Sequence, residues 1–197
     1  SNDNYIISKG IYNVKKPIIV PVGKNLIIEA GVKLKMMEDT FIEIQNGNVE
    51  MNGRENMPIE ILAYDDDKKW SGIYVNSTNF DKKSILKFVK IQDSLQFNNN
   101  FIQLTGAINF ISSDVIIKNV NILNTDAEDA INLVNSKIIV LNSNFEKNKS
   151  DAIDVDFSTG IIENTYFNNI GGDAIDLSGS KVEIKNIYAN KVIDKVI

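Results

Sequence analysis

The sequence predicts an all-β solenoid, a stack of similar coils of about 22 residues each, and three observations support this. Units beginning at Ala130, Ala152 and Ala174 follow one another at steps of 22 residues, and the unit beginning at Ala107 is one residue longer. Apolar residues alternate within each unit, which indicates short strands with one buried face. No stretch between these strands has the length or periodicity of a helix, so we expect helices to be absent from the coils.

Each unit has room for three strands. The first is expected to bury pairs of apolar residues, Ile108 and Phe110, Ile131 and Leu133, Ile153 and Val155, and Ile175 and Leu177. The second is expected to bury Val115 and Ile117, Ile138 and Val140, Ile161 with Ile162 near it, and Val182 and Ile184. The third is expected to end at Ile122, Phe145, Phe167 and Ala189.

Two polar columns accompany the strands. One contains Asn119, Asn142, Asn164 and Asn186, and the other contains Ser113, Ser136, Ser158 and Ser180. Asparagine tolerates left-handed backbone, and serine hydroxyls can bond to the backbone of turns. We interpret both columns as turn chemistry that holds the coils together, and not as ligand sites.

Composition excludes several classes of function. The chain has 197 residues, a net charge of −5 and one arginine, Arg54, so nucleic-acid binding is not expected. It has no cysteine and therefore no disulfide or thiolate chemistry. It has no apolar run of membrane-spanning length, so membrane insertion is not expected either.

Two groups of motifs carry a resemblance to a known family. The later half reads SDAIDVDFSTGIIENTYFNNIGGDAIDLSGSKVEIKN, and the earlier half contains PVGKNLIIEAGVKLKM, IEIQNGNVEMNGRENMPIEI and KKWSGIYVNS. From about Ile18 onward the chain resembles the pectate-lyase-like superfamily. The resemblance implies a single-stranded right-handed parallel β-helix with three short parallel sheets. It also implies a bacterial protein that is secreted, periplasmic or at the cell surface, with polysaccharide as the ligand class.

The expected organisation is one elongated domain. Residues 1–16 are expected to form an N-terminal cap segment, and residues 17–197 the β-helix, with the clearest repeats at 107–195. The C-terminal coil has no recognisable polar cap, although solenoid ends need one. We therefore expect a piece of a longer protein with further domains, or end-to-end self-association.

The first strand of each coil supplies the candidate ligand-binding residues. The residue between its two buried positions points outward, which gives a polar ladder of Asn109, Asn132, Asp154 and Asp176 with rungs about 4.8 Å apart. Tyr74 and Trp70, in an earlier coil, are candidates for an aromatic sugar platform. Trp70 has the alternative of packing at the start of its strand. A loop around DSLQFNNNF, with Phe97 and Phe101, is expected to lean over this face.

Carboxylates crowd one edge of the same face, because Asp129, Asp151 and Asp173 precede the strands. Three interpretations compete. The aspartates can accept backbone hydrogen bonds in turns. Alternatively, they can bind Ca²⁺ with hard oxygen ligands from Asp129, Asp151, Asp154, Asp173 and Asp176.

The third interpretation is catalysis by Asp151, Asp154, Asp173 and Asp176, since rungs spaced by about 5 Å or 10 Å bracket the carboxylate separations of glycosidases. Asp126, in Asn124-Thr125-Asp126, resembles one polygalacturonase motif, but the other motifs of that family are missing. A polysaccharide lyase would need a base, and Arg54 lies in a turn of the early coils, far from the acidic ladder.

We therefore expect an extracytoplasmic module that binds polysaccharide through an elongated polar face. The alternatives are a polysaccharide lyase or glycoside hydrolase that uses the aspartates, with or without Ca²⁺, and a structural spacer of a surface adhesin. The ladder is close to uniform along the repeats, which favours binding over catalysis.

Overall fold

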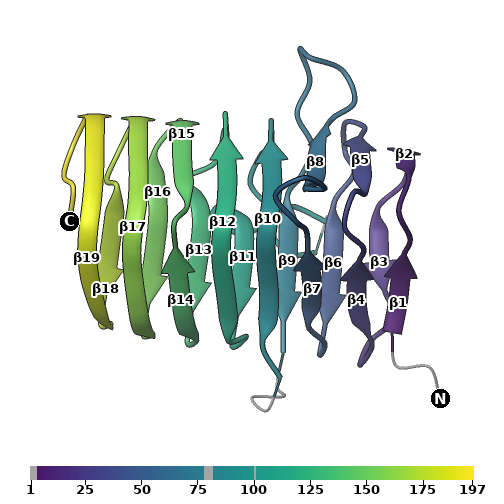
Figure 1. Cartoon of the computed structure of the whole chain (residues 1–197), viewed down its shortest axis with the longest axis horizontal. Helices are drawn as coiled ribbons and strands as arrows, with labels where there is room; N and C mark the ends of the chain where they lie inside the picture. The colour runs from purple at the N-terminus through teal and green to yellow at the C-terminus, as the bar shows by residue number, and fades with distance from the viewer. Residues whose placement is uncertain (1–3, 78–81, 100) are drawn as a thin grey trace.

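The computed structural model describes residues 4–77, 82–99 and 101–197. These residues form a parallel β-solenoid of about eight turns with roughly 23 residues per turn (Figure 1). No helix occurs among them. The predicted all-β stack of coils is thereby confirmed.

One row of strands forms a seven-stranded parallel sheet that holds the first strand of each coil. Its order is β18-β16-β13-β11-β9-β6-β3. The strands are β3 (Ile18–Val20), β6 (Ile42–Gln45), β9 (Ile73–Asn76), β11 (Gly106–Ile111), β13 (Asp129–Val134), β16 (Asp151–Asp156) and β18 (Ile175–Ser178).

The other strands form one twelve-stranded sheet. It contains β1 (Asn4–Ile7), β2 (Ile11–Val14), β4 (Asn25–Ile28), β5 (Lys33–Met36), β7 (Val49–Asn52), β8 (Ile59–Ala63), β10 (Ser84–Gln92), β12 (Val115–Leu123), β14 (Lys137–Leu141), β15 (Asn144–Asn148), β17 (Thr159–Ile170) and β19 (Lys181–Val192). The early coils each contribute two short strands to this sheet, one to each of its two rows. The long strands β10, β12, β17 and β19 instead span both rows and pair with strands in each. The three predicted strand rows are therefore present, but hydrogen bonding joins two of them into one sheet.

The asparagine column lies at the bend between the two strand rows of this sheet. Asn119, Asn142, Asn164 and Asn186 all have positive φ, between 49° and 55°. Asparagine adopts this left-handed conformation at lower cost than most residues, and it lets a strand turn onto the next face. The turn role predicted for this column is confirmed.

The serine column joins neighbouring coils. The hydroxyl oxygen of Ser136 accepts the backbone N–H of Ser113 at 3.1 Å, and Ser158 and Ser180 do the same for the preceding coil at 3.0 and 2.9 Å. These hydroxyls satisfy backbone donors buried at the corner, where no strand partner exists. The column has the structural role that its regularity predicted.

The core runs along the inside of the solenoid. The inward residues of β11, β13 and β16 are fully buried, and Phe145 stacks on Phe167 of the next coil with ring centroids 5.3 Å apart. Burying one large apolar side chain stabilises the fold by about 1.5–3 kcal/mol. Because the same positions are apolar in every coil, the core has no natural end along the axis.

The two ends differ from the middle. Residues 4–14, expected as part of a cap, form β1 and β2, which pair in parallel with β4 and β5 as the first rung. At the other end, β19 pairs with β17 and its side chains are largely exposed.

Candidate functional site

The outer face of the seven-stranded sheet includes a row of side chains, one from each strand, in strict register. We call this set the outer row: Ile19, Glu43, Tyr74, Asn109, Asn132, Asp154 and Asp176. The sequence predicted the register of its last four members, and the strand pairing confirms it. Parallel strands place successive members about 4.8 Å apart.

An insertion covers the middle of the outer row. We call residues 94–99 and 101–105 the cover segment. Its anchor is Phe97, which is fully buried and packs against Phe41 and Tyr74, each with a centroid separation of 5.3 Å. Asn99 Nδ2 donates to Glu43 Oε2 at 2.9 Å. The cover segment is thus attached to the sheet by an aromatic contact and a hydrogen bond.

The cover segment removes two predicted ligand-binding residues from solvent. Asn109 is 1 % exposed and donates to the carbonyl oxygens of Ile73 and Gly106 at 3.1 and 2.7 Å. Asn132 is 8 % exposed and donates to Thr105 Oγ1 at 2.9 Å. Both amides hold the sheet and its cover in place, because buried polar groups are stable only when bonded.

The aromatic candidates lie differently from each other. Trp70 is fully buried and its Nε1 donates to the carbonyl oxygen of Gln92 at 2.9 Å, so it packs at the start of its strand and has no exposed face for a sugar. Tyr74 is half-buried beneath Phe97, and burial together with the nearby Glu43 raises the pKa of its hydroxyl. Phe101 is 95 % exposed, at the tip of the cover segment.

Beyond the cover segment the outer row is open and acidic. Asp154 and Asp176 are half-buried neighbours on β16 and β18, and Asn132 Nδ2 donates to Asp154 Oδ2 at 3.1 Å. Burial raises the pKa of Asp154 to about 7, helped by Asp129, Asp156, Asp176 and Asp151. Asp154 is therefore a carboxyl group that holds and releases a proton near neutral pH.

The aspartates that precede these strands make turn contacts. Asp151 Oδ1 accepts the backbone N–H of Asp173 at 2.8 Å, and Asp173 Oδ1 accepts that of Lys195 at 2.7 Å. Asp129 is buried, which raises its pKa, and one of its carboxylate oxygens accepts from Asn132 Nδ2 at 3.2 Å. The predicted backbone role is seen for Asp151 and Asp173, whereas Asp129 accepts its bond from a side chain.

The calcium hypothesis gains no added support. Within residues 4–77, 82–99 and 101–197, no three His, Cys, Asp or Glu side chains converge in a way that could hold a metal ion. The aspartates still supply hard oxygens, so Ca²⁺ binding stays a prediction for experiment. No helix in the described part of the chain is long and apolar enough to cross a membrane.

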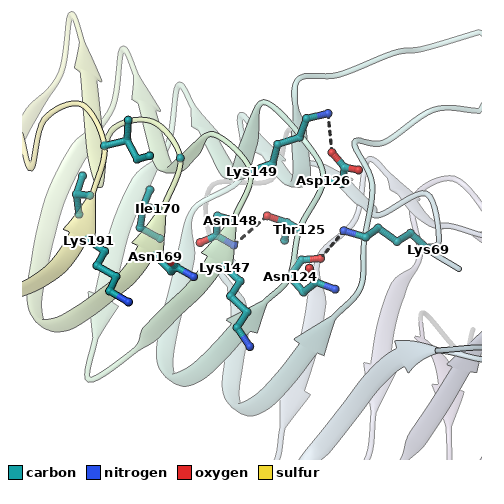
Figure 2. A pocket seen from close by; sticks show the side chains of 13 residues that line it. Lys69, Asn124, Thr125, Asp126, Lys147, Asn148, Lys149, Asn169, Ile170 and Lys191 are labelled. Carbon is teal, nitrogen blue, oxygen red and sulfur yellow. Dashed lines mark hydrogen bonds and ion pairs between the residues drawn. The ribbon is translucent and has the colours of Figure 1, made fainter. Parts of the chain in front are cut away.

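A groove with a volume of about 750 Å³ lies at a different corner, where the twelve-stranded sheet turns toward the seven-stranded one. We call it the corner groove; Figure 2 shows its side chains. It contains Asp126, whose pKa is lowered by a hydrogen-bonded ion pair with Lys149, with Oδ1 and Nζ 2.7 Å apart. Such a carboxylate stays ionised and is unsuited to donate a proton, which disfavours the polygalacturonase-like role. Arg54 lies far away along the chain, exposed in a turn bonded to Met57.

Sequence reasoning missed two features of this surface. It did not identify Glu43 and Asn99 as the contact that joins the cover segment to the sheet, because neither belongs to a clear repeat. It also did not identify the four lysines that line one groove, Lys69, Lys147, Lys149 and Lys191. The alternation of Asn124, Lys147, Asn169 and Lys191 at steps of 22 or 23 residues was the available signal.

Comparison with known proteins does not assign the chain to a family. No protein-family model matches the chain, and no curated protein sequence matches it. Among solved structures, the surface protein and adhesin PfbA of Streptococcus pneumoniae is similar at 11% identity. The match covers 98% of this chain and 91% of that one, with a TM-score of 0.17.

Proposed function

We propose that this chain is an extracytoplasmic β-helix module that binds an uncharged polysaccharide along the open end of the outer row. The observation that carries the proposal is the in-register alignment of Asp154 and Asp176 on neighbouring strands beyond the cover segment. A linear glycan lying along the solenoid axis would meet a polar side chain at every rung, about 4.8 Å apart.

The chemistry of the open end favours an uncharged chain. Carboxylates accept hydrogen bonds from sugar hydroxyls, and bonds that involve a charged partner are stronger than neutral ones. An acidic glycan would be repelled by Asp154, Asp156 and Asp176. The bond from Asn132 to Asp154 orients one carboxyl group before any ligand arrives, which reduces the entropy lost on binding.

Binding should be measured by affinity electrophoresis and calorimetry with xylan, glucomannan and dextran, and with polygalacturonate as an acidic comparison. We expect the parent chain to bind at least one uncharged polymer and an Asp154→Asn/Asp176→Asn variant to lose most of that affinity. The matched control is Asp66→Asn/Asp67→Asn, which changes the charge equally at exposed residues between β8 and β9. Equal loss in both variants, or no binding in the parent, would contradict the proposal and favour the spacer alternative.

A second candidate function is glycoside hydrolysis with Asp154 as the proton donor. The specific observation is its pKa of about 7 beside the carboxyl group of Asp176 on the next rung. A general acid needs a pKa near the working pH, and a second carboxylate about 5 Å away suits a retaining mechanism. Release of new reducing ends from a bound polymer, falling as pH rises through about 7 and abolished by Asp154→Asn, would establish this activity.

Ca²⁺ is tested with the same proteins. Calorimetric titration of Ca²⁺ into chelator-treated parent chain should show saturable binding if the carboxylates act together as ligands. Loss of that binding in the Asp154→Asn/Asp176→Asn variant, but not in Asp66→Asn/Asp67→Asn, would assign the ion to the open end of the outer row.

A further inference from the structure

The corner groove presents a charge pattern opposite to that of the rest of the molecule. Its lining contains four lysines and one aspartate, although the whole chain has a net charge of −5. The aspartate, Asp126, is already neutralised by Lys149 at 2.7 Å. Lys69 Nζ donates to the carbonyl oxygen of Asn124 at 3.0 Å, which holds its ammonium group at one wall of the groove (Figure 2).

Two of the lysines belong to a regular column. Strand register places Leu123, Glu146, Asn168 and Asn190 on successive rungs, so the residues that follow them, Asn124, Lys147, Asn169 and Lys191, form the next column. Amides and ammonium groups therefore alternate along the groove. Because adjacent strands are about 4.8 Å apart, the two lysines are separated by about 10 Å at their backbones.

The backbone directs all four side chains in the same way. Asn124, Lys147, Asn169 and Lys191 have φ values of 54°, 56°, 64° and 54°. Asparagine takes this left-handed conformation readily, whereas lysine does so at a cost. Asparagine at two of the four positions meets the conformational requirement of the turn. The lysines at the other two positions, which adopt this conformation at a cost, therefore need a functional explanation.

The charges of this column are poorly neutralised. Lys191 has no acidic side chain within ion-pair distance among the described residues, and Lys147 reaches Glu146 only at 3.8 Å. Both lysines are exposed at the mouth of the groove. Exposed ion pairs of this length contribute little, so both ammonium groups can bind an external anion.

We propose that the corner groove binds a linear acidic polysaccharide in which negative charges recur about every 10 Å, twice the strand spacing. An acidic sugar alternating with an uncharged one has this pattern. Lys147 and Lys191 bind successive carboxylate or sulfate groups, Asn169 binds a hydroxyl group between them, and Asn124 binds one on the other side of Lys147. This site is separate from the outer row and goes beyond the function proposed above.

Nucleic acid fits the groove less well. Duplex DNA carries one charge per about 1.7 Å of axis, and proteins that bind it neutralise many phosphates together. The groove has two weakly paired lysines, no arginine and no aromatic residue in its lining on which a base could stack. A polymer with sparse charges matches this arrangement better.

The test uses the full chain and hyaluronan, in which an acidic sugar alternates with an uncharged acetylated amino sugar. Lys147→Asn/Lys191→Asn places in the column the residue type that already occupies its other two rungs. The variant should fold and melt at an equal or higher temperature, because asparagine suits the left-handed backbone. We expect its dissociation constant for hyaluronan to rise about tenfold or more, because two charge-assisted contacts are lost.

The matched control is Lys137→Asn/Lys181→Asn. These exposed lysines also lie two rungs apart in register, on either side of Thr159, but outside the corner groove. This control removes the same charge at the same spacing, and we expect less than about a twofold change because exposed charges outside a site contribute little. Equal weakening by both variants would reduce the effect to general charge attraction and overturn the proposal.

Three further outcomes would also overturn it: no binding of hyaluronan by the parent, equal binding of dextran, or tighter binding of a single-stranded polynucleotide at the same salt concentration. The Asp154→Asn/Asp176→Asn variant separates the two sites. It should keep its affinity for hyaluronan even where it loses affinity for an uncharged glycan, so that failure of one proposal leaves the other standing.

Discussion

The covered and open halves of the outer row occupy equivalent positions in the repeat but have opposite properties. Asn109 and Asn132, under the cover segment, are buried and hydrogen-bonded, whereas Asp154 and Asp176, one and two rungs further on, are half-buried and acidic. The strand register is continuous across this boundary. The repeat therefore decides which way a side chain points, and the insertion decides whether solvent reaches it.

The change from amide to carboxylate coincides with this boundary for a physical reason. A buried amide needs only hydrogen-bond partners, whereas a buried carboxylate also loses the solvation of its charge. Glu43 is the exception under the cover segment: it is 5 % exposed and accepts hydrogen bonds from Asn99 and Gln45. These two amides compensate a carboxylate that would otherwise be costly to bury.

Among variants that test the difference between the covered and open halves, the largest effect is expected from removing Phe97, the anchor of the cover segment. Phe97→Ala should lower the free energy of unfolding by about 3–5 kcal/mol, the usual cost of deleting a buried phenylalanine ring. Urea denaturation measures this loss. The matched control is Phe101→Ala in the same segment, whose 95 % exposed ring should change stability by less than about 0.5 kcal/mol. Similar losses in the two variants would mean that Phe97 does not anchor the segment.

An intermediate effect is expected from breaking the polar contacts at the boundary. Asn132→Ala removes bonds to Thr105, Asp129 and Asp154 and should cost about 1–3 kcal/mol. Asn121→Ala is the control, because that asparagine is exposed on β12. Hydrogen exchange should also show faster opening of the cover segment in Asn132→Ala alone. An unchanged exchange rate would show that this bond does not fasten the cover.

The smallest effect concerns the open half and depends on pH. The folded state raises the pKa of Asp154 to about 7 from an ordinary value of 3.8, so the folded chain binds more protons than the unfolded chain between these values. Stability from this group is complete below about pH 4 and is lost as pH rises to about 7.

The Asp154→Asn variant has no carboxyl group at this position and therefore does not lose this stability as pH rises. The variant should exceed the parent in stability by the smallest amount near pH 4 and by roughly 1 kcal/mol at pH 8. The difference stays this small because solvent screens a half-exposed carboxylate. Thermal melts at several pH values measure the difference, with Asp66→Asn as the control at an exposed site. A gain that does not vary with pH would contradict the raised pKa.

Much of the fold could be predicted because a solenoid repeats one local solution. The inward pairs such as Ile131 and Leu133, the left-handed Asn119 and the hydroxyl of Ser136 each follow from periodicity and turn chemistry. The candidate site was less predictable. Asn109 was expected to face a ligand and is buried, because the cover segment lies outside the repeat pattern, whereas Trp70 follows its alternative prediction and packs at the start of its strand.

The sequence by itself determined the coil length, the inward and outward faces and the register of the outer row. These properties are local, since each coil needs only the neighbouring coil to pair its backbone and bury its apolar face. Only the tertiary structure decided which outward residues remain exposed, that Asp154 holds a proton near neutral pH, and that four lysines meet in one groove. Exposure and charge environment depend on segments distant in the chain, and therefore they emerge only once the coils are stacked.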